Sequence, residues 1–447
     1  MDILSLLQCL QPSLTRTTVS QLSHIVLALL TMSGRVTMLG IARWTEVGGS
    51  YRTVQRWFYT AIPWAQVFWL FFRQHLFHAD DVYLLAGDEV VVTKAGHQTY
   101  GLDCFFSGLL KKPVPGLAFF AWSLVSLKER RAFPIQLEQV VRSAEEKAAC
   151  QAKVAARLKP GPKRPVGRPK GSRNQNKPVA SLHPELQRIQ RMLQALLQLC
   201  TGVLSLTYVL LDGHFGNKHA FQMVRACGLH LISKLRSDSA LYLPYTGPQL
   251  PRGARRKYGA KIDYRHLPEQ FLKQSSVEGE METRIYQAHL LHKAFAQPLN
   301  VVILVKRNLT TQARAHVVLF SSDLALAAEQ IIDYYSLRFQ IEFNFRDAKQ
   351  FWGLEDFMNV NQTAVTNAAT LSLFMVNVAH RLLGDFRVDE PLFSILDLKA
   401  HCRGLKYVTE TLKMLPQKLD LNFIAPLLRH VTALGRIHTV KPQPCSS

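Results

Sequence analysis

Two short apolar runs in the middle of the chain each lead into an aspartate. Residues 82–88 read V-Y-L-L-A-G-D, and residues 206–211 run directly into Asp212. Continuous apolar runs of this length are typical of strands buried on both faces of a sheet. We therefore expect Asp88 and Asp212 at the ends of two central strands. Further strands are expected at 98–106, 116–127 and 229–235, and helices at 184–199, from about residue 135 and from about residue 217.

The pattern changes on either side of these strands. Both ends of the chain look mainly helical, whereas a loop rich in Pro, Gly and Arg at 244–261 precedes runs that alternate between apolar and polar residues. Such alternation predicts strands at 283–291, 300–306 and 315–320. The fold class we expect is an α/β core with a β-rich insertion, flanked by helical N-terminal and C-terminal regions. The expected boundaries are 1–80, 81–236, 237–325, 326–360 and 361–447.

Two short helices are predicted at 35–44 and 50–59, on either side of a Glu-Val-Gly-Gly turn. This spacing is that of a helix-turn-helix, whose second helix contacts DNA. Arg52 and Arg56 would then face the DNA. A pair of helices that simply pack on each other has the same pattern, and both interpretations remain open.

The composition changes sharply at residues 151–180. This stretch contains nine Lys or Arg residues and no acid, and its Pro and Gly residues disfavour a regular element. We expect an exposed basic loop that contacts the DNA backbone. Within it, Gly167-Arg168-Pro169-Lys170 resembles the core of a minor-groove hook, so Arg168 and Lys170 are candidate DNA-binding residues. A solvated linker without a specific contact is the alternative.

The charge of the whole chain supports a polyanionic partner. Among 447 residues, Lys and Arg outnumber Asp and Glu by 54 to 32, and the net charge is +22. An excess of this size favours nucleic acid over a small metabolite. The seven cysteines include no C-x-x-C pair, which disfavours a zinc ribbon, and their odd number and scattered positions are typical of a reducing compartment. The apolar runs are too short to span a bilayer and the N-terminus is a poor signal peptide, so we expect a cytoplasmic protein without a membrane partner.

One predicted helix carries four functional side chains at regular spacing. Tyr335, Arg338, Glu342 and Lys349 are offset by 0, 3, 7 and 14 residues. At about 3.6 residues per turn, they fall within roughly 60° of one helix face. A carboxylate beside a phenol, a guanidinium and an ammonium suits a metal ion next to phosphates. A surface helix with i,i+4 ion pairs is the alternative, but burial on the other sides is predicted by the apolar residues Ile331, Phe339, Ile341, Phe343 and Phe345.

Three acids form the candidate catalytic set. Asp88 and Asp212 end predicted core strands, where an α/β sheet binds its ligands, and Glu342 lies on the later helix. Any one of them could be a solvated strand-end carboxylate or a helix cap. Three converging carboxylates repel one another unless cations bridge them, so two hard divalent ions are expected. Two such ions can drive an in-line phosphoryl transfer.

These residues carry a resemblance to a known family. From about residue 84 to 357 the chain resembles the DDE transposases of bacterial insertion sequences. It is most similar to the group with a Tyr-x2-Arg-x3-Glu-x6-Lys signature, which Tyr335, Arg338, Glu342 and Lys349 match at every spacing.

The resemblance implies an RNase H-like core in which Asp88, Asp212 and Glu342 bind two Mg²⁺ ions, with Mn²⁺ as a possible substitute. It implies that Tyr335, Arg338 and Lys349 hold phosphates near a cleaved transposon end. The implied partner is double-stranded DNA, bound by a homodimer in a synaptic complex within the bacterial nucleoid. The implied activity is cut-and-paste transposition from terminal inverted repeats. A nuclease or resolvase with the same acids and a non-catalytic DNA-binding protein are the alternatives.

The chain departs from the family pattern after the first acid. Family members often have an Asp and a Thr there, whereas Glu89 and Val90 follow Asp88. Glu89 could be an additional or competing ligand, but strand alternation predicts that it points away. Related enzymes often stack a flipped base on a Trp of the insertion during hairpin cleavage. The insertion of this chain has no Trp, and the candidate substitutes are Tyr242, Tyr245, Tyr258 and Trp352.

Overall fold

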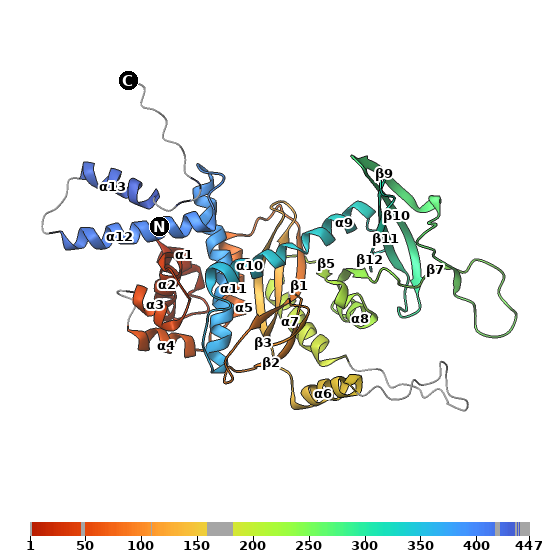
Figure 1. Cartoon of the computed structure of the whole chain (residues 1–447), viewed down its shortest axis with the longest axis horizontal. Coiled ribbons are helices and arrows are strands. Elements are labelled where there is room, and N and C mark those ends of the chain that lie inside the picture. The colour runs from red at the N-terminus through yellow and green to blue at the C-terminus, as the bar shows by residue number, and fades with distance from the viewer. Residues whose placement is uncertain are drawn as a thin grey trace, which may run out of the picture.

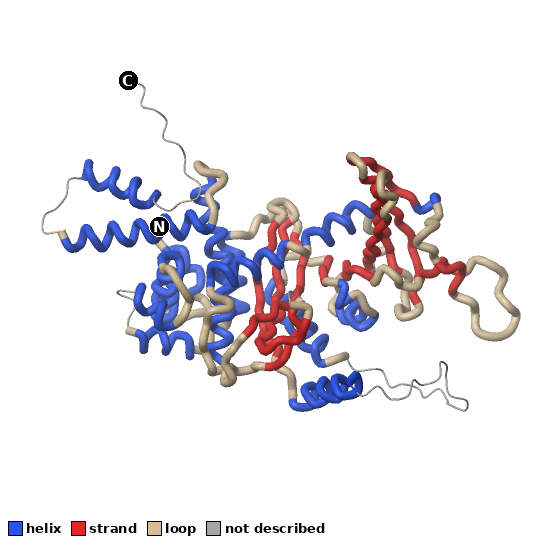
Figure 2. Tube along the Cα trace, in the orientation of Figure 1, coloured by secondary structure: helices blue, strands red, loops and turns tan. Residues whose placement is uncertain are grey.

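The computed structural model describes residues 2–45, 50–108, 110–158, 182–415, 421–433, 436 and 438. Figure 1 shows helices from both ends of the chain gathered on one side and a sheet in the middle. A β-rich arm lies on the other side. Figure 2 shows the same division, with mainly helices at one end of the long axis and mainly strands in the arm at the other.

The central part of the sheet combines antiparallel and parallel strands. β1 (Tyr83–Thr93) pairs antiparallel with β3 (Lys112–Ser126), and β3 pairs antiparallel with β4 (Arg131–Val140). On its other edge, β1 is parallel to β5 (Tyr208–Leu211), which is parallel to β6 (His230–Leu235). The strand order is therefore β4-β3-β1-β5-β6.

Two predictions for this region need correction. The helix expected from about residue 135 is wrong, because β4 occupies that segment and the next helix is α6 (Ala144–Leu158). Pairing with β3, which lies earlier in the chain, determines that conformation. The strand expected at 98–106 begins later, as β2 (Asp103–Ser107), and it also pairs with β3. Residues 151–158 of the expected basic loop belong to α6, and residues 159–181 lie outside the described part.

The predicted insertion continues the same sheet. β12 (Arg314–Ser321) pairs antiparallel with β6, and β11 (Leu299–Asn308) and β10 (Met281–His292) follow in order. The three strands expected here are therefore observed with longer bounds. The remaining strands of the arm are β7 (Leu241–Pro244), β8 (Tyr258–Lys261) and β9 (Leu272–Glu278).

Helices cover both faces of the core sheet, because alternate residues of its strands are apolar on both sides. Leu84 and Ala86 of β1 pack in one buried cluster with α9 (Ala328–Leu337). Tyr83 and Leu85 belong to a second cluster on the other face. That cluster includes residues of α5 (Trp64–His75), α7 (Pro184–Cys200) and α8 (Lys218–Ala226).

The helix that carries Glu342 is divided in two, whereas a continuous helix was predicted. α9 ends at Leu337 and α10 (Gln340–Trp352) begins after a turn at Arg338 and Phe339. The turn residues keep right-handed helical angles but donate to carbonyls three residues earlier, which tightens the chain locally. α10 ends at Gly353, whose φ of 79° favours glycine.

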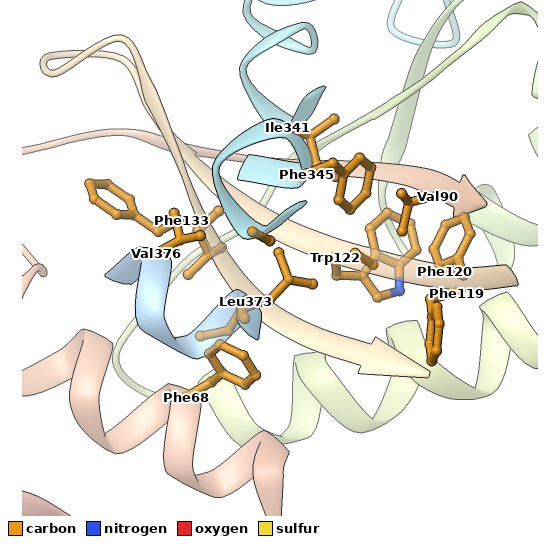
Figure 3. Packing of buried hydrophobic residues seen from close by; sticks show 14 of the residues in the cluster. Phe68, Val90, Phe119, Phe120, Trp122, Phe133, Ile341, Phe345, Leu373 and Val376 are labelled. Carbon is orange, nitrogen blue, oxygen red and sulfur yellow. The ribbon is translucent and has the colours of Figure 1, made fainter. Parts of the chain in front are cut away.

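α10 is anchored to the core through one side only. Ile341 and Phe345 belong to the buried cluster that also contains Val90 and Trp122 (Figure 3). On another side, Phe339 and Phe343 are 49% and 37% exposed and stack edge-to-face at 5.3 Å. The expected burial of these two phenylalanines is therefore wrong, although the helix is anchored firmly enough to position Glu342.

The helices of the two chain ends pack on each other. α11 (Gln362–Arg387) presents Asn367, whose amide nitrogen donates to the carbonyls of Phe58 and Thr60 at 2.7 Å and whose oxygen accepts from Trp64 Nε1 at 2.8 Å. Asn367 is 1% exposed, so these bonds satisfy a buried polar group. The other helices here are α1 (Ile3–Leu7), α2 (Arg16–Thr31), α3 (Met38–Trp44), α4 (Tyr51–Tyr59), α12 (Ile395–Met414) and α13 (Leu421–Ala433).

Candidate active site

The pairing of β1 with β5 brings the two predicted aspartates together. The parallel register aligns Gly87 with Leu211, so Asp88 lies beside Asp212, the residue that follows β5. The predicted strand end at Asp88 is wrong, because pairing with β3 extends β1 to Thr93 and leaves Asp88 in the middle of the strand. Neighbouring strands lie about 4.8 Å apart, which makes these residues close neighbours at one edge. A Cβ at Gly87 would come within 2.5 Å of the Trp122 ring, so glycine is required directly before Asp88.

Arg338 links the first acid to the third. Its Nη1 donates to Asp88 Oδ2 at 2.9 Å, and its Nη2 donates to Glu342 Oε1 at 2.9 Å. The Arg338 side chain is 13% exposed, whereas those of Asp88 and Glu342 are 19% and 40% exposed. The turn between α9 and α10 therefore positions a guanidinium between two of the three candidate acids.

All three acids line one cleft of about 740 Å³. Asp88 enters it from β1, Asp212 from the end of β5 and Glu342 from the first turn of α10. Asp212 is held in place because its Oδ1 accepts the His214 N–H at 3.1 Å and its carbonyl accepts from Ser233 Oγ at 2.8 Å. The sequence prediction thus identified three acids that the fold brings to a common cavity.

The electrostatics of the cleft favour a bound cation. Burial raises the pKa of Asp88 to about 6, although Arg338 opposes this shift, and the charges of Asp212 and Glu342 add to it. Burial also raises the pKa of Tyr335, whose ring centroid lies 5.9 Å from the Arg338 guanidinium carbon. Mutual repulsion between carboxylates of this kind is relieved by divalent ions with oxygen ligands.

A family model for the DDE superfamily endonucleases matches residues 9–297. This match covers more than half of the chain and includes both Asp88 and Asp212. The chain belongs to the DDE superfamily endonuclease family. No curated protein matches it.

Membership of the DDE superfamily establishes the general chemistry. A DDE endonuclease is a metal-dependent enzyme of the nuclease and transposase type, and its substrate is DNA. The mixed sheet covered by helices agrees with an α/β DDE nuclease fold. Within the described ranges, none of the helices is both long enough and apolar enough to cross a membrane.

The donor set of this DDE endonuclease fits hard divalent cations, although the carboxylates are not arranged as a finished metal site. Among the described residues, no group of three or more His, Cys, Asp or Glu side chains is placed to hold a metal ion. Asp88, Asp212 and Glu342 supply only carboxylate oxygens, the ligands that Mg²⁺ and Mn²⁺ prefer. In this arrangement the Arg338 guanidinium bridges two of the three carboxylates.

Lys349 lines the same cleft, and its ammonium group already contacts two oxygen atoms. Its Nζ donates to the Val91 carbonyl at 3.0 Å and lies 2.8 Å from Glu355 Oε1. These contacts fasten the last turns of α10 to β1. An ammonium has three donor hydrogens, so one remains for a phosphate oxygen. Trp352 is 1% exposed, which favours packing over base stacking.

Glu89 lies closer to the site than the sequence predicted. It lines the same cleft as Asp88, although its charged neighbours are Glu185, Arg142 and His214. The predicted alternation does not remove Glu89 from the cavity, because consecutive residues of β1 from Asp88 to Val91 all line the cleft. Burial raises the pKa of Glu89 to about 7, with repulsion from Glu185 adding to the shift.

Glu185 and His214 both line the cleft, and their pairing was not predicted from the sequence. His214 Nε2 lies 3.4 Å from Glu185 Oε1. This contact raises the pKa of His214 and lowers that of Glu185. Glu185 is in the first turn of α7, where an acid stabilises almost any helix. Its sequence position therefore carries no signal of a cleft.

The other candidate DNA-binding residues lie away from the acids or outside the described part. Arg52 and Arg56 are exposed on α4, whose Val54 and Trp57 are buried. The predicted helix pair is observed as α3 and α4, and the turn between them, at 46–49, is outside the described residues. Arg168 and Lys170 also lie outside the described residues.

Proposed function

We propose that this DDE endonuclease is a cut-and-paste DNA transposase with an RNase H-like core. The observation that carries the proposal is the common cleft of Asp88, Asp212 and Glu342, reached from two adjacent parallel strands and one later helix. The order β4-β3-β1-β5-β6, with three antiparallel strands followed by two parallel ones, supports the RNase H-like assignment.

The three acids would hold two Mg²⁺ ions, for which Mn²⁺ can substitute. When bound, the ions would activate the attacking oxygen and stabilise the leaving oxygen of an in-line displacement. Asp88 and Asp212 would supply ligands from a rigid sheet edge, and Glu342 would supply them from α10. Ligands on rigid elements keep the reacting groups aligned, which is where most of the acceleration in phosphoryl transfer arises.

The remaining signature residues would grip the DNA end. Arg338 has five donor hydrogens in a planar fork that matches a phosphate, and Lys349 adds a point charge. Tyr335 lies against Arg338 and would limit the directions in which its guanidinium can move. Arg52, Arg56, Arg168 and Lys170 would contact the flanking duplex, and the net charge of +22 supports an extended DNA track. Two ends must be joined together, so we expect a homodimer in the synaptic complex.

The deciding experiment uses duplex DNA carrying the inverted repeats that flank the coding sequence in its source genome. Purified protein with Mg²⁺ should release the ends and join a pre-cut 3′-hydroxyl end to a target plasmid. Asp88→Ala, Asp212→Ala and Glu342→Ala should each abolish both steps while DNA binding stays within about threefold, because phosphate contacts supply most of the affinity.

Each alternative function predicts a different result in that assay. Cleavage without joining of the pre-cut end would indicate a nuclease or resolvase. Binding that is unaffected by Mg²⁺, with neither cleavage nor joining in the unmodified chain, would indicate a DNA-binding protein. Retained cleavage in all three alanine variants would overturn the assignment of the acids.

A further inference from the structure

The Arg338 guanidinium uses two of its nitrogens on two different candidate metal ligands. Nη1 bonds Asp88 Oδ2 and Nη2 bonds Glu342 Oε1, both at 2.9 Å. The other Asp88 oxygen, Oδ1, accepts the Glu89 N–H at 2.8 Å. Both oxygens of Asp88 therefore have a hydrogen-bond donor, and for Oδ2 that donor is a cation.

A divalent ion and this guanidinium cannot share those oxygens at low cost. An ion bound to Asp88 Oδ2 or Glu342 Oε1 would lie about 2–2.5 Å from an oxygen that also contacts Arg338. The two like charges would repel strongly, because the Arg338 side chain is only 13% exposed and water screens little there. One of the two cations has to move.

We propose that Arg338 is a built-in counter-cation that competes with the metal ions for Asp88 and Glu342 and is transferred to a DNA phosphate when the ions bind. This inference rests on the proposed assignment of the acids as metal ligands. It goes beyond a phosphate-gripping role, because it makes Arg338 a regulator of metal affinity before any DNA is present.

Three features of the site suit such a transfer. Nε of Arg338 is buried and has no hydrogen-bond partner among the residues that the structure describes, so the guanidinium is not fully satisfied in its present position. The residue lies in the turn between α9 and α10, and reorienting its side chain breaks none of the backbone hydrogen bonds of that turn. A phosphate offers the same forked acceptor geometry as the two carboxylates do together.

The inference has a reciprocal consequence. If a phosphate removes Arg338 from the carboxylates, DNA raises the affinity for metal, and by linkage metal raises the affinity for DNA by the same factor. Removing the guanidinium abolishes that coupling. The competition therefore delays assembly of the metal site until a DNA end is bound.

The test measures Mn²⁺ binding to the full-length protein by titration calorimetry, first without DNA. Arg338→Gln should bind Mn²⁺ about tenfold more tightly than the unmodified chain, within the range usual for coupled sites. Arg338→Lys, which keeps one charge but cannot form the fork, should lie between them. With a duplex carrying one terminal repeat, the unmodified chain should gain affinity and Arg338→Gln should not.

Arg346→Gln is the matched control. Arg346 lines the same cleft and is on α10, but its guanidinium bonds Asp347 and does not contact the three acids. It should change Mn²⁺ affinity by less than about twofold, because its effect is that of an exposed charge. An equal gain in this variant would attribute the change to net charge and overturn the proposal.

Two further outcomes separate this inference from the proposed function. Asp88→Asn should lose Mn²⁺ binding. If it does, and Arg338→Gln binds Mn²⁺ no more tightly than the unmodified chain, the competition is refuted while the ligand assignment stands. If Asp88→Asn retains Mn²⁺ binding, both are overturned. Far-UV circular dichroism shows whether each variant is folded. If Arg338→Gln is unfolded, the Mn²⁺ affinity of Arg338→Lys still tests the competition.

Discussion

Asp88 and Glu89 are adjacent on β1, yet their carboxylates are balanced by different cations. Asp88 is held by the guanidinium of Arg338, whereas Glu89 lies near Arg142 and the imidazole of His214, which is paired with Glu185. Alternation along the strand directs the two side chains to opposite faces of the sheet, and both line one cleft. We call the side with Asp88, Asp212 and Glu342 the Asp88 wall, and the side with Glu89, Glu185 and His214 the Glu89 wall. The comparison shows how two adjacent residues in the middle of one strand can supply a candidate metal ligand and a separate buried acid.

The two walls differ in what their cations can do. A guanidinium stays charged at every accessible pH, so the positive charge that Arg338 presents to Asp88 does not change with pH. The charge of an imidazole is lost near neutral pH, so the Glu89 wall changes with pH instead. We therefore expect substitutions on the Asp88 wall to affect chemistry and those on the Glu89 wall to affect stability.

The largest expected effect is a difference in cleavage rate between variants of the adjacent residues Asp88 and Glu89. Asp88→Asn should lower Mg²⁺-dependent cleavage by on the order of 10³-fold or more, as expected when a member of a catalytic set is removed. Glu89→Gln should lower the cleavage rate by no more than about tenfold, the lower end of the loss caused by removing a group that supports the metal ligands without binding the metal. Single-turnover rates on a labelled terminal duplex measure both.

Equal losses in the two variants would contradict this separation and would make Glu89 a ligand in its own right. DNA binding of each variant at fixed salt serves as the control, because neither substitution removes a positive charge.

Sequence reasoning found the Asp88 wall because its signals are local. An apolar run that ends in an acid identifies Asp88 and Asp212, and fixed spacing identifies Arg338 and Glu342. The Glu89 wall depends on how α7 packs on the sheet, which no local pattern encodes. The same limit explains β4, whose conformation follows from pairing with β3.

The break between α9 and α10 was also hidden from the sequence. Arg338 and Phe339 are ordinary helix residues, and neither Pro nor Gly marks the turn. The core strands β1, β3, β5 and β6 were predictable because they are continuous apolar runs, and β10 to β12 because they alternate between apolar and polar residues. The helical character of both chain ends was predictable as well. The precise position of Arg338 between two acids was not, because it follows from this turn.

A smaller effect should appear in stability. The pKa of Glu89 is raised from 4.5 to about 7, so the folded chain keeps a proton that the unfolded chain has released. Between these values stability falls as pH rises, and the penalty is complete above pH 7. Glu89→Gln removes the charge and should raise the free energy of unfolding at pH 8 by about 1–3 kcal/mol, with little change at pH 4.

Urea unfolding in chelator at both pH values measures this difference. Glu278→Gln, which changes an exposed acid on β9, is the matched control and should have nearly the same effect at both pH values. A gain for Glu89→Gln that is equally large at pH 4 would mean that packing, rather than the buried charge, is responsible.

The smallest expected effect tests the imidazole on the Glu89 wall. His214 and Glu185 are 66% and 30% exposed, so their ion pair should stabilise the fold by less than about 1 kcal/mol. Because Glu185 raises the pKa of His214 above 6.5, this contribution is present below pH 6.5 and is lost as pH rises through the higher folded value. His214→Asn should lower the unfolding midpoint slightly at pH 6 and leave it unchanged at pH 8.5.

Two controls apply to this prediction. His97→Asn, at an exposed histidine, should show no such difference, and 1 M salt should reduce the effect of His214→Asn at pH 6. An effect of His214→Asn that persists at pH 8.5 would show that the neutral ring packs against Phe215, 4.9 Å away between centroids, rather than serving as a counter-charge.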